Sequence, residues 1–313
     1  MDETEDRPAA IRQYRQLAKN IIETHFGKPP SRIVYKRSGK TNFVFVVNHV
    51  EGQFVVRLTP EKERIEAFRK ELWASKKVRE AGVPSPEVLF VGNDTGSEPY
   101  MITRRVTGSE ATDHSKRGHI VHEMGRYAQI INSIPTENFG GNFDWNTDAP
   151  KKRTWSEYID EELEFDRKLK LLGDQKILSK QDVLKLRQII DDTRTTHINP
   201  SLNHGDLRLK NIIVDEDGEI AAIVDWDECI STIAPQWELS IALHDLSIDE
   251  KHLFLDGYGV SAEDMTKMAP LIKAFNIINY SAAIERAIET KDHKTLAEIK
   301  LRMSSALDLY SLT

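Results

Sequence analysis

The sequence has a single cysteine, Cys229, so the chain cannot form an internal disulfide, which is compatible with a reducing cytoplasm. It also lacks any run of about 18 apolar residues, so a membrane-spanning helix is not expected. The first six residues, 1–6, are acidic, where a secretory signal would be basic and then apolar. These absences predict a cytoplasmic protein with no membrane partner.

Internal repeats and low-complexity stretches are also missing, and 39% of the residues are apolar while 30% are charged. This balance is typical of a globular protein, and 313 residues exceed one ordinary core and fit two lobes. The net charge of -7 disfavours a nucleic-acid partner and mildly favours a cationic small-molecule acceptor. The same charge is common among cytoplasmic proteins with no special preference, so it decides little.

The most informative pattern is His-Gly-Asp-Leu-Arg-Leu-Lys-Asn at 204–211, followed by Asp-Trp-Asp at 225–227. Between them, two β-rich runs flank an Asp-Gly turn over residues 212–224, which predicts a hairpin. A hairpin returns the chain beside its start. We therefore expect the second motif to lie near Asn211.

The oxygen-bearing side chains of these motifs suit phosphoryl transfer. Mg²⁺ prefers oxygen ligands and commonly takes one or two from protein carboxylates, with phosphates and water supplying the rest. Asn211 and Asp225 fit this need, which leaves Asp206 to receive the proton of an acceptor hydroxyl. The alternative is that Asp206 is a surface turn aspartate and that the other two residues merely cap turns.

The pattern His-Gly-Asp-Leu-x-x-x-Asn, then Ile-Val-Asp-Trp, resembles the catalytic loop and metal-binding strand of the aminoglycoside phosphotransferase-like kinases. These relatives of the protein kinases phosphorylate small-molecule hydroxyls. Upstream, Ser38-Gly39-Lys40-Thr41-Asn42 is similar to the family's nucleotide loop, which joins two strands over the phosphates. Glu71 lies where the family has its helix glutamate, and the resemblance spans residues 30–245.

Two positions depart from the family pattern. Arg57 takes the place of the third-strand cation, commonly lysine or arginine, that pairs with the helix glutamate and the α/β phosphates. Arginine keeps the charge but is a longer, planar fork. Beyond the metal strand, Glu238 replaces the scaffold aspartate of the family.

The resemblance implies an α+β, two-lobed, protein-kinase-like fold. A small N-terminal antiparallel-sheet lobe would span residues 1–103, and a larger, mainly helical lobe residues 104–313. The hinge would begin near Met101, where backbone groups read the adenine edge. The implied nucleotide-binding residues are Ser38, Gly39, Thr41, Asn42, Arg57, Glu71, Met101 and Thr103.

Hydrophobic periodicity and breakers predict the individual elements. The expected helices are 8–26, 61–81, 114–133, 154–171 and 179–196, with more from 236 onward; the expected strands are 33–35, 43–50, 54–58, 88–91 and 100–103.

Three further features each have two interpretations. Arg208 follows Asp206 by two residues and either points toward the γ-phosphate or is a solvated or structural arginine. His204 is expected to brace the loop rather than act as a base. The acidic stretch 157–166 either recognises an amine acceptor or forms a solvated helix face.

The predicted function is transfer of the γ-phosphate of ATP or GTP, with Mg²⁺, to a hydroxyl of an aminoglycoside-like compound, an amino alcohol or a sugar. The alternative is a nucleotide-binding, pseudokinase-type regulatory module without phosphotransfer. A protein kinase is disfavoured, because His-Arg-Asp and Asp-Phe-Gly are His-Gly-Asp and Asp-Trp-Asp here. The pattern leaves open the acceptor, the choice of nucleotide, the oligomeric state and any antibiotic resistance.

Overall fold

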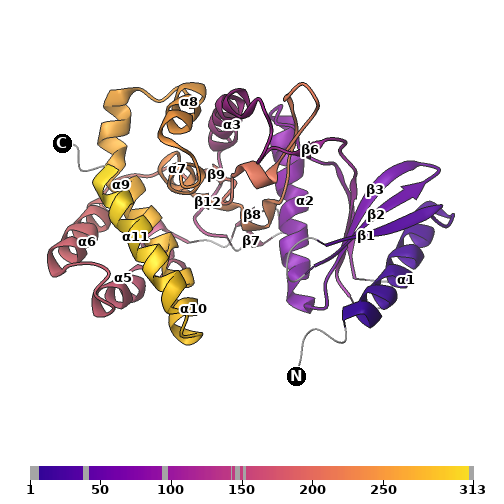
Figure 1. Cartoon of the computed structure of the whole chain (residues 1–313), viewed down its shortest axis with the longest axis horizontal. Coiled ribbons are helices and arrows are strands. Elements are labelled where there is room, and N and C mark those ends of the chain that lie inside the picture. The colour runs from indigo at the N-terminus through magenta and orange to yellow at the C-terminus, as the bar shows by residue number, and fades with distance from the viewer. Residues whose placement is uncertain are drawn as a thin grey trace. The chain divides into compact units, whose positions relative to one another are not determined.

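The computed structural model describes residues 7–37, 42–93, 98–141, 143–144, 149–150 and 153–309 (Figure 1). The chain forms two compact units. The first unit comprises residues 1–115 and 210–227, and the second unit comprises residues 116–209 and 228–313. The predicted lobe boundary at residue 103 stays a prediction. Within the described ranges, no helix is both long and apolar enough to cross a membrane.

A five-stranded antiparallel sheet forms the centre of the first unit, in the order β1-β2-β3-β5-β4. All five strands were predicted from sequence to within two residues at each end. Their bounds are Arg32–Lys36 (β1), Phe43–His49 (β2), Gly52–Leu58 (β3), Val88–Gly92 (β4) and Tyr100–Arg104 (β5).

Helix α1 (Arg7–Phe26) covers one face of this sheet (Figure 1). Its buried residues, among them Ile21 and Ile22, pack against Phe54, Val56 and other strand residues. Because successive side chains of a strand point to opposite faces, the alternate residues of β3 are left for the other side of the sheet. Burial of each apolar side chain between α1 and the sheet contributes roughly 1.5–3 kcal/mol to the free energy of folding.

Helix α2 (Ile65–Glu80) contacts β4 and β5 and follows a short 3₁₀ turn, Lys62–Arg64. It ends at Gly82, whose φ of 86° lets the Val83 N–H reach back to the Val78 carbonyl at 2.9 Å. Glu71 lies on the buried face of α2. The predicted helix 61–81 is thus confirmed, with its first turn in 3₁₀ form.

The predicted hairpin is also confirmed. Strands β10 (Ile212–Val214) and β11 (Ile220–Ile223) pair antiparallel, and β6 (Ser109–Glu110) adds a third strand beside β10. In the turn, the Asp215 carboxylate accepts the N–H groups of Asp217 and Glu219, each at 2.9 Å.

The second unit is mainly helical, with two short two-stranded sheets. The predicted α+β class, with an antiparallel sheet in the N-terminal part and helices in the C-terminal part, is confirmed. The remaining elements are α3 (Arg117–Asn132), β7 (Phe143–Asp144), β8 (Ala149–Pro150), α4 (Trp155–Glu157), α5 (Phe165–Asp174), α6 (Lys180–Arg194), β9 (Ser201–Asn203), β12 (Ile230–Thr232), α7 (Gln236–Ala242), α8 (Ile248–Tyr258), α9 (Ala262–Asn279), α10 (Ser281–Glu289) and α11 (His293–Leu309).

The predicted continuous helix 154–171 is wrong. After α4 the chain makes a π-helical turn over Tyr158–Glu162, and Glu164 then takes a left-handed φ of 51° before α5 begins. Leu163 and Phe165 are both buried. In an unbroken α-helix, residues two apart point in nearly opposite directions, so the break allows both side chains to reach the core.

Helices α3 and α8 approach each other at glycines. A Cβ on Gly125 would overlap the Phe254 carbonyl oxygen, and a Cβ on Gly257 would overlap the His122 carbonyl oxygen. The crossing of these two helices therefore depends on the absence of a side chain at both positions.

Candidate active site

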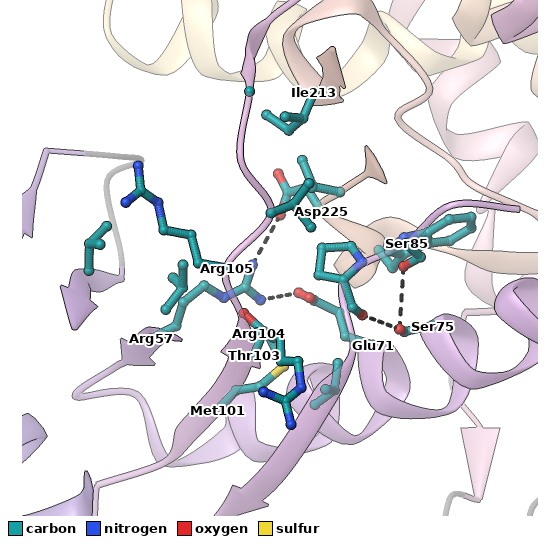
Figure 2. Close-up of a pocket in the computed structure, with 18 of the residues that line it drawn as sticks. Arg57, Glu71, Ser75, Ser85, Met101, Thr103, Arg104, Arg105, Ile213 and Asp225 are labelled. Carbon is teal, nitrogen blue, oxygen red and sulfur yellow. Dashed lines mark hydrogen bonds and ion pairs between the residues drawn. The ribbon is translucent and has the colours of Figure 1, made fainter. Parts of the chain in front are cut away.

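A cavity of about 270 Å³ lies in the first unit, and Figure 2 shows the residues that line it. Val55 and Arg57 of β3 line it, whereas their neighbours Phe54 and Val56 pack with α1, so the cavity is on the sheet face opposite α1. Five residues predicted from sequence line it: Arg57, Glu71, Met101, Thr103 and Asp225. Apolar residues, among them Val46, Val55, Val88, Ile213 and Val224, form much of the rest of the wall, together with the cations Lys36, Arg104 and Arg105. A cavity that combines apolar side chains with several cationic ones suits a flat base joined to an anionic tail.

Arg57 is the centre of the polar end of this cavity. Its guanidinium donates to Glu71, and its Nη1 lies 3.5 Å from Asp225 Oδ1, so it connects α2 with the end of the hairpin (Figure 2). The predicted Arg57–Glu71 pair is therefore present. A lysine would offer a single nitrogen, whereas the fork of arginine reaches both carboxylates at once.

The hairpin brings Asn211 and Asp225 together as expected. The Val224 N–H donates to the Asn211 carbonyl at 2.9 Å, so Asp225 follows directly after a residue bonded to Asn211. Asn211 is buried, and Asp225 has a left-handed φ of 69°. Aspartate tolerates that conformation better than most residues, and such strain is concentrated at functional sites.

Three carboxylates converge at this end of the cavity. Oxygens of Glu71, Asp225 and Asp227 all lie within 4.8 Å of one another. Burial raises the pKa of Glu71 to about 7; Arg57 opposes this rise, and Asp227 and Asp225 add to it. Arg57 contacts Glu71 and Asp225, and Arg64 contacts Asp227, so two guanidiniums face three carboxylates. An oxygen-rich group of this kind suits a hard divalent cation.

The predicted phosphate loop lies largely outside the described residues, which exclude Ser38, Gly39 and Thr41. Asn42 is described. Its Oδ1 is buried and has no hydrogen-bond partner among the described residues. An unpaired buried polar atom is costly, which is consistent with a polar ligand next to it.

Residues 204–209 of the predicted catalytic loop belong to the second unit, and residues 210 and 211 belong to the first. The His204 N–H donates to Glu238, and the Asp206 N–H donates to His204 Nδ1 at 3.2 Å. Gly205 has a φ of 80°, and a Cβ there would overlap the Glu228 carbonyl oxygen. His204 and Glu238 therefore brace the loop, as the sequence predicted for the histidine.

Arg208 contacts the predicted base directly. Its Nε lies 2.8 Å from Asp206 Oδ1, and its Nη1 lies 3.4 Å from Asp245 Oδ2. The Asp206 side chain is 14% exposed, so its carboxylate is held largely out of water. The arginine holds this carboxylate in place, while its predicted direction toward a γ-phosphate stays a prediction.

A model of the phosphotransferase enzyme family (APH) matches residues 36–271, well over half of the chain. The chain belongs to the phosphotransferase enzyme family. It is a small-molecule kinase, and the predicted resemblance to aminoglycoside phosphotransferase-like kinases is confirmed. No curated protein matches it.

Solved structures confirm the protein-kinase-like fold of this phosphotransferase. Aminoglycoside phosphotransferase APH(4)-Ia is 17% identical, with a TM-score of 0.70 over 95% of this chain and 99% of the other. A mutant of that protein was solved with AMP-PNP and hygromycin B (17% identity, TM-score 0.67, 94% and 99% coverage). APH(2")-IIIa, solved with GDP and kanamycin, is 14% identical, with a TM-score of 0.65 over 93% of this chain and 99% of the other.

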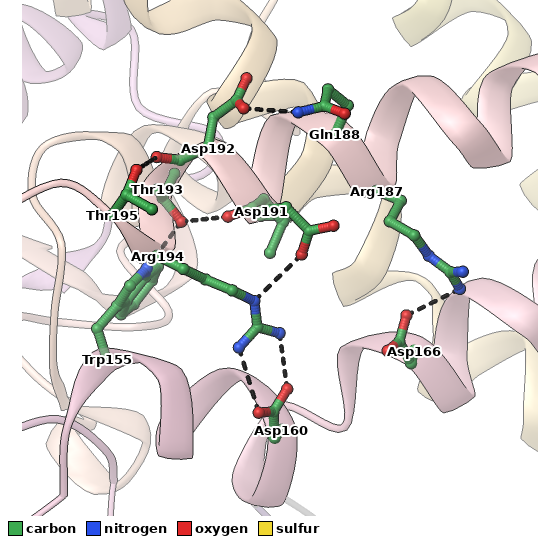
Figure 3. A network of polar contacts seen from close by, with 11 residues as sticks. Trp155, Asp160, Asp166, Arg187, Gln188, Asp191, Asp192, Thr193, Arg194 and Thr195 are labelled. Atoms are coloured by element: carbon green, nitrogen blue, oxygen red, sulfur yellow. Dashed lines mark hydrogen bonds and ion pairs between the residues drawn. The ribbon is translucent and has the colours of Figure 1, made fainter.

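In this phosphotransferase, the carboxylates of the acidic stretch 157–166 already have partners, and those of Asp160 and Asp166 are shown in Figure 3. Asp160 accepts two bonds from Arg194, at 2.6 and 3.2 Å, and Asp166 lies 2.9 Å from Arg187. The others pair as follows: Glu161 and Glu162 with Arg153, Glu164 with Arg167, and Glu157 with the N-cap Thr154. This geometry favours a structural role over recognition of an amine.

Sequence reasoning missed two groups at the site. Asp227 joins the carboxylate cluster. Arg64, in the 3₁₀ turn before α2, pairs with it, with its Nη2 2.7 Å from Asp227 Oδ2. The second aspartate of Asp-Trp-Asp was a signal for the first of these. Arg64 gave none, because its partner is 163 residues away in sequence.

The raised pKa of Glu238 leads us to expect that the stability of this kinase depends on pH. Burial raises the pKa of Glu238 from 4.5 to about 7. The folded protein then binds more protons than the unfolded chain between those values, so the free energy of unfolding falls as the pH rises from about 4.5 to 7, by up to about 3 kcal/mol. Glu238→Gln, which keeps a carbonyl acceptor for His204, should reduce that fall in urea unfolding at pH 5 and pH 7.

The matched control is Glu263→Gln, since the Glu263 side chain is 78% exposed. It should keep the wild-type pH dependence. An equal fall in wild type and Glu238→Gln would contradict the assigned pKa.

Proposed function

We propose that this kinase transfers the γ-phosphate of ATP to a hydroxyl of a small molecule: an aminoglycoside-like compound, an amino alcohol or a sugar. The observation that carries the proposal is Arg57, which contacts Glu71 and Asp225 together at the polar end of an apolar cavity. Residues 1–103 would bind the nucleotide and residues 104–313 would supply the catalytic loop and bind the acceptor.

In the nucleotide site, the base would lie among the apolar strand residues, near Met101 and Thr103. Arg57, held by Glu71, would face the phosphates, with the loop of Ser38, Gly39, Thr41 and Asn42 over them. Asn211 and Asp225 would hold Mg²⁺, which neutralises phosphate charge when bound.

Asp206 would act on the acceptor. It orients the hydroxyl, whose oxygen forms a bond to the γ-phosphorus while the bond from that phosphorus to the bridging oxygen breaks. ADP leaves with the electron pair, and the hydroxyl proton passes to the Asp206 carboxylate. Because the transition state is loose, positioning and charge neutralisation carry most of the catalysis. Arg208 would hold the carboxylate in its orientation.

The test is consumption of ATP and, in parallel, GTP with Mg²⁺ across aminoglycosides, amino alcohols, sugars and nucleosides. Acceptor-dependent turnover that disappears in Asp206→Ala supports the proposal. Nucleotide binding by calorimetry with no turnover on any acceptor would instead support a regulatory module without phosphotransfer.

A further inference from the structure

A second cavity, of about 220 Å³, lies wholly within the second unit, next to the catalytic loop. Arg208, which contacts Asp206, forms part of its wall. The rest comes from α7 and the turn after it, and from α9 and α10. A molecule in this cavity would therefore lie beside the group that holds the predicted base.

Two asparagines on α9, Asn276 and Asn279, line this cavity. Asn276 Nδ2 donates to the Ser240 carbonyl at 2.8 Å, and Asn279 Nδ2 donates to Ser240 Oγ at 3.3 Å. Ser240 Oγ gives its own proton to the Trp237 carbonyl, so it can only accept from Asn279. Both amide orientations are thereby fixed. Among the described residues neither Oδ1 has a partner, and residues three apart share one face of a helix.

The lining also includes an imidazole, that of His244, and the aromatic ring of Tyr280. His244 Nδ1 lies 2.9 Å from Asp245 Oδ1. In the tautomer that carries its proton on Nδ1, the imidazole offers Nε2 as a hydrogen-bond acceptor. The ring of Tyr280 lies 5.0 Å from that of His244 and, with Ile241, gives an apolar surface. Groups that accept hydrogen bonds would bind the hydroxyls of a sugar, and the apolar surface beside them would contact the C–H groups of its ring.

Within the described ranges, the residues that line the cavity offer a polycation no carboxylate of their own. Among the described residues that line the cavity there is no carboxylate, and the charged group present is the guanidinium of Arg208. The acidic stretch 157–166, the other source of negative charge considered from sequence, is paired with arginines and a helix cap. The carboxylates nearest to Arg208, those of Asp206 and Asp245, already pair with it, so several ammonium groups would have to compete with Arg208 for them.

We propose that this cavity is the acceptor site and that the acceptor is an uncharged polyhydroxylated molecule of the carbohydrate class. Its hydroxyls would donate to Asn276, Asn279 and His244, while one further hydroxyl would lie at Asp206. The inference rests on the proposed kinase function, because it assigns the substrate class of that same reaction.

The experiment uses the full chain with ATP and Mg²⁺. The probes are uncharged (glucose, ribose, maltose and myo-inositol), singly charged (choline) or polycationic (kanamycin and hygromycin B). Phosphorylation is measured for each probe, and binding is measured by saturation-transfer NMR with ADP present. We expect at least one uncharged probe to be phosphorylated with a kcat/KM at least about tenfold above that of every cationic probe.

Variants test the wall itself. Asn276→Asp and Asn279→Asp each replace an amide that donates to Ser240, and each should raise the KM for the uncharged acceptor roughly five- to tenfold while leaving the KM for ATP unchanged. The matched control is Gln129→Glu on α3, an exposed amide that also donates to a serine hydroxyl, at 3.0 Å. It should leave both constants unchanged. Melting temperatures verify that each variant is folded.

The outcomes separate the two claims. Phosphorylation of cationic probes alone overturns the inference and leaves the kinase function standing. Saturation-transfer signals from an uncharged probe that weaken in both asparagine variants, without turnover, support the acceptor site and count against the kinase function. Neither turnover nor binding of any uncharged probe overturns the inference.

Discussion

Asp206→Ala should lower kcat by roughly 10²–10⁴-fold, the usual range for removal of a general base, while the KM for ATP changes little. The carboxylate belongs to the second unit, whereas the residues predicted to hold the nucleotide belong to the first. Steady-state kinetics with the acceptor found in the panel, at saturating ATP, measure the loss. Calorimetry with ADP and Mg²⁺ shows whether nucleotide affinity persists.

The control for this variant is Asp256→Ala, which removes an exposed aspartate from α8 in the same unit. It should retain wild-type kcat. Folded Asp206→Ala protein with more than a tenth of wild-type kcat would contradict the role of Asp206 as base and favour a purely structural part for it in the loop.

Asp225→Ala should affect both nucleotide affinity and turnover. It removes the predicted metal ligand and also one of the two carboxylates that Arg57 contacts. Loss of one charge-stabilising group of this kind costs on the order of 10²–10³-fold in kcat. The dependence of ADP binding on Mg²⁺ tests the metal-binding role more specifically than kcat does. Mg²⁺ should strengthen ADP binding to the wild type and should fail to do so in the variant.

Calorimetric titrations of ADP with and without Mg²⁺ test this, with Asp217→Ala as the control. Asp217 is an exposed aspartate in the turn of the same hairpin. A variant at Asp225 that still gains affinity from Mg²⁺ would place the metal on other groups, with Glu71 and Asp227 the nearest carboxylates.

The parts of this protein that are encoded locally could be read from its sequence. The hairpin over 212–223 followed from an Asp-Gly turn between β-rich runs, and the hairpin then fixed the neighbourhood of Asn211 and Asp225. The Arg57–Glu71 pair followed from the family pattern.

The features that were not predicted from the sequence depend on contacts with residues far away along the chain. The break in the predicted helix 154–171 lets Leu163 and Phe165 both pack in a core to which other helices contribute. Asn276 and Asn279 carried a faint signal, since asparagine is disfavoured inside helices, but their partner Ser240 lies 36 residues before the first of them.

The discontinuous first unit also constrains how the protein is made. Its N-terminal part provides β6 and the Pro84 carbonyl, while the strand that pairs with β6 and the Ile223 N–H that binds Pro84 come from the hairpin. A ribosome that has synthesised only residues 1–115 has therefore not yet supplied the pieces that complete this unit. Its final assembly waits until residue 227 has emerged, by which time about half of the second unit has also been translated. The two units are thus expected to mature together during synthesis, not one after the other.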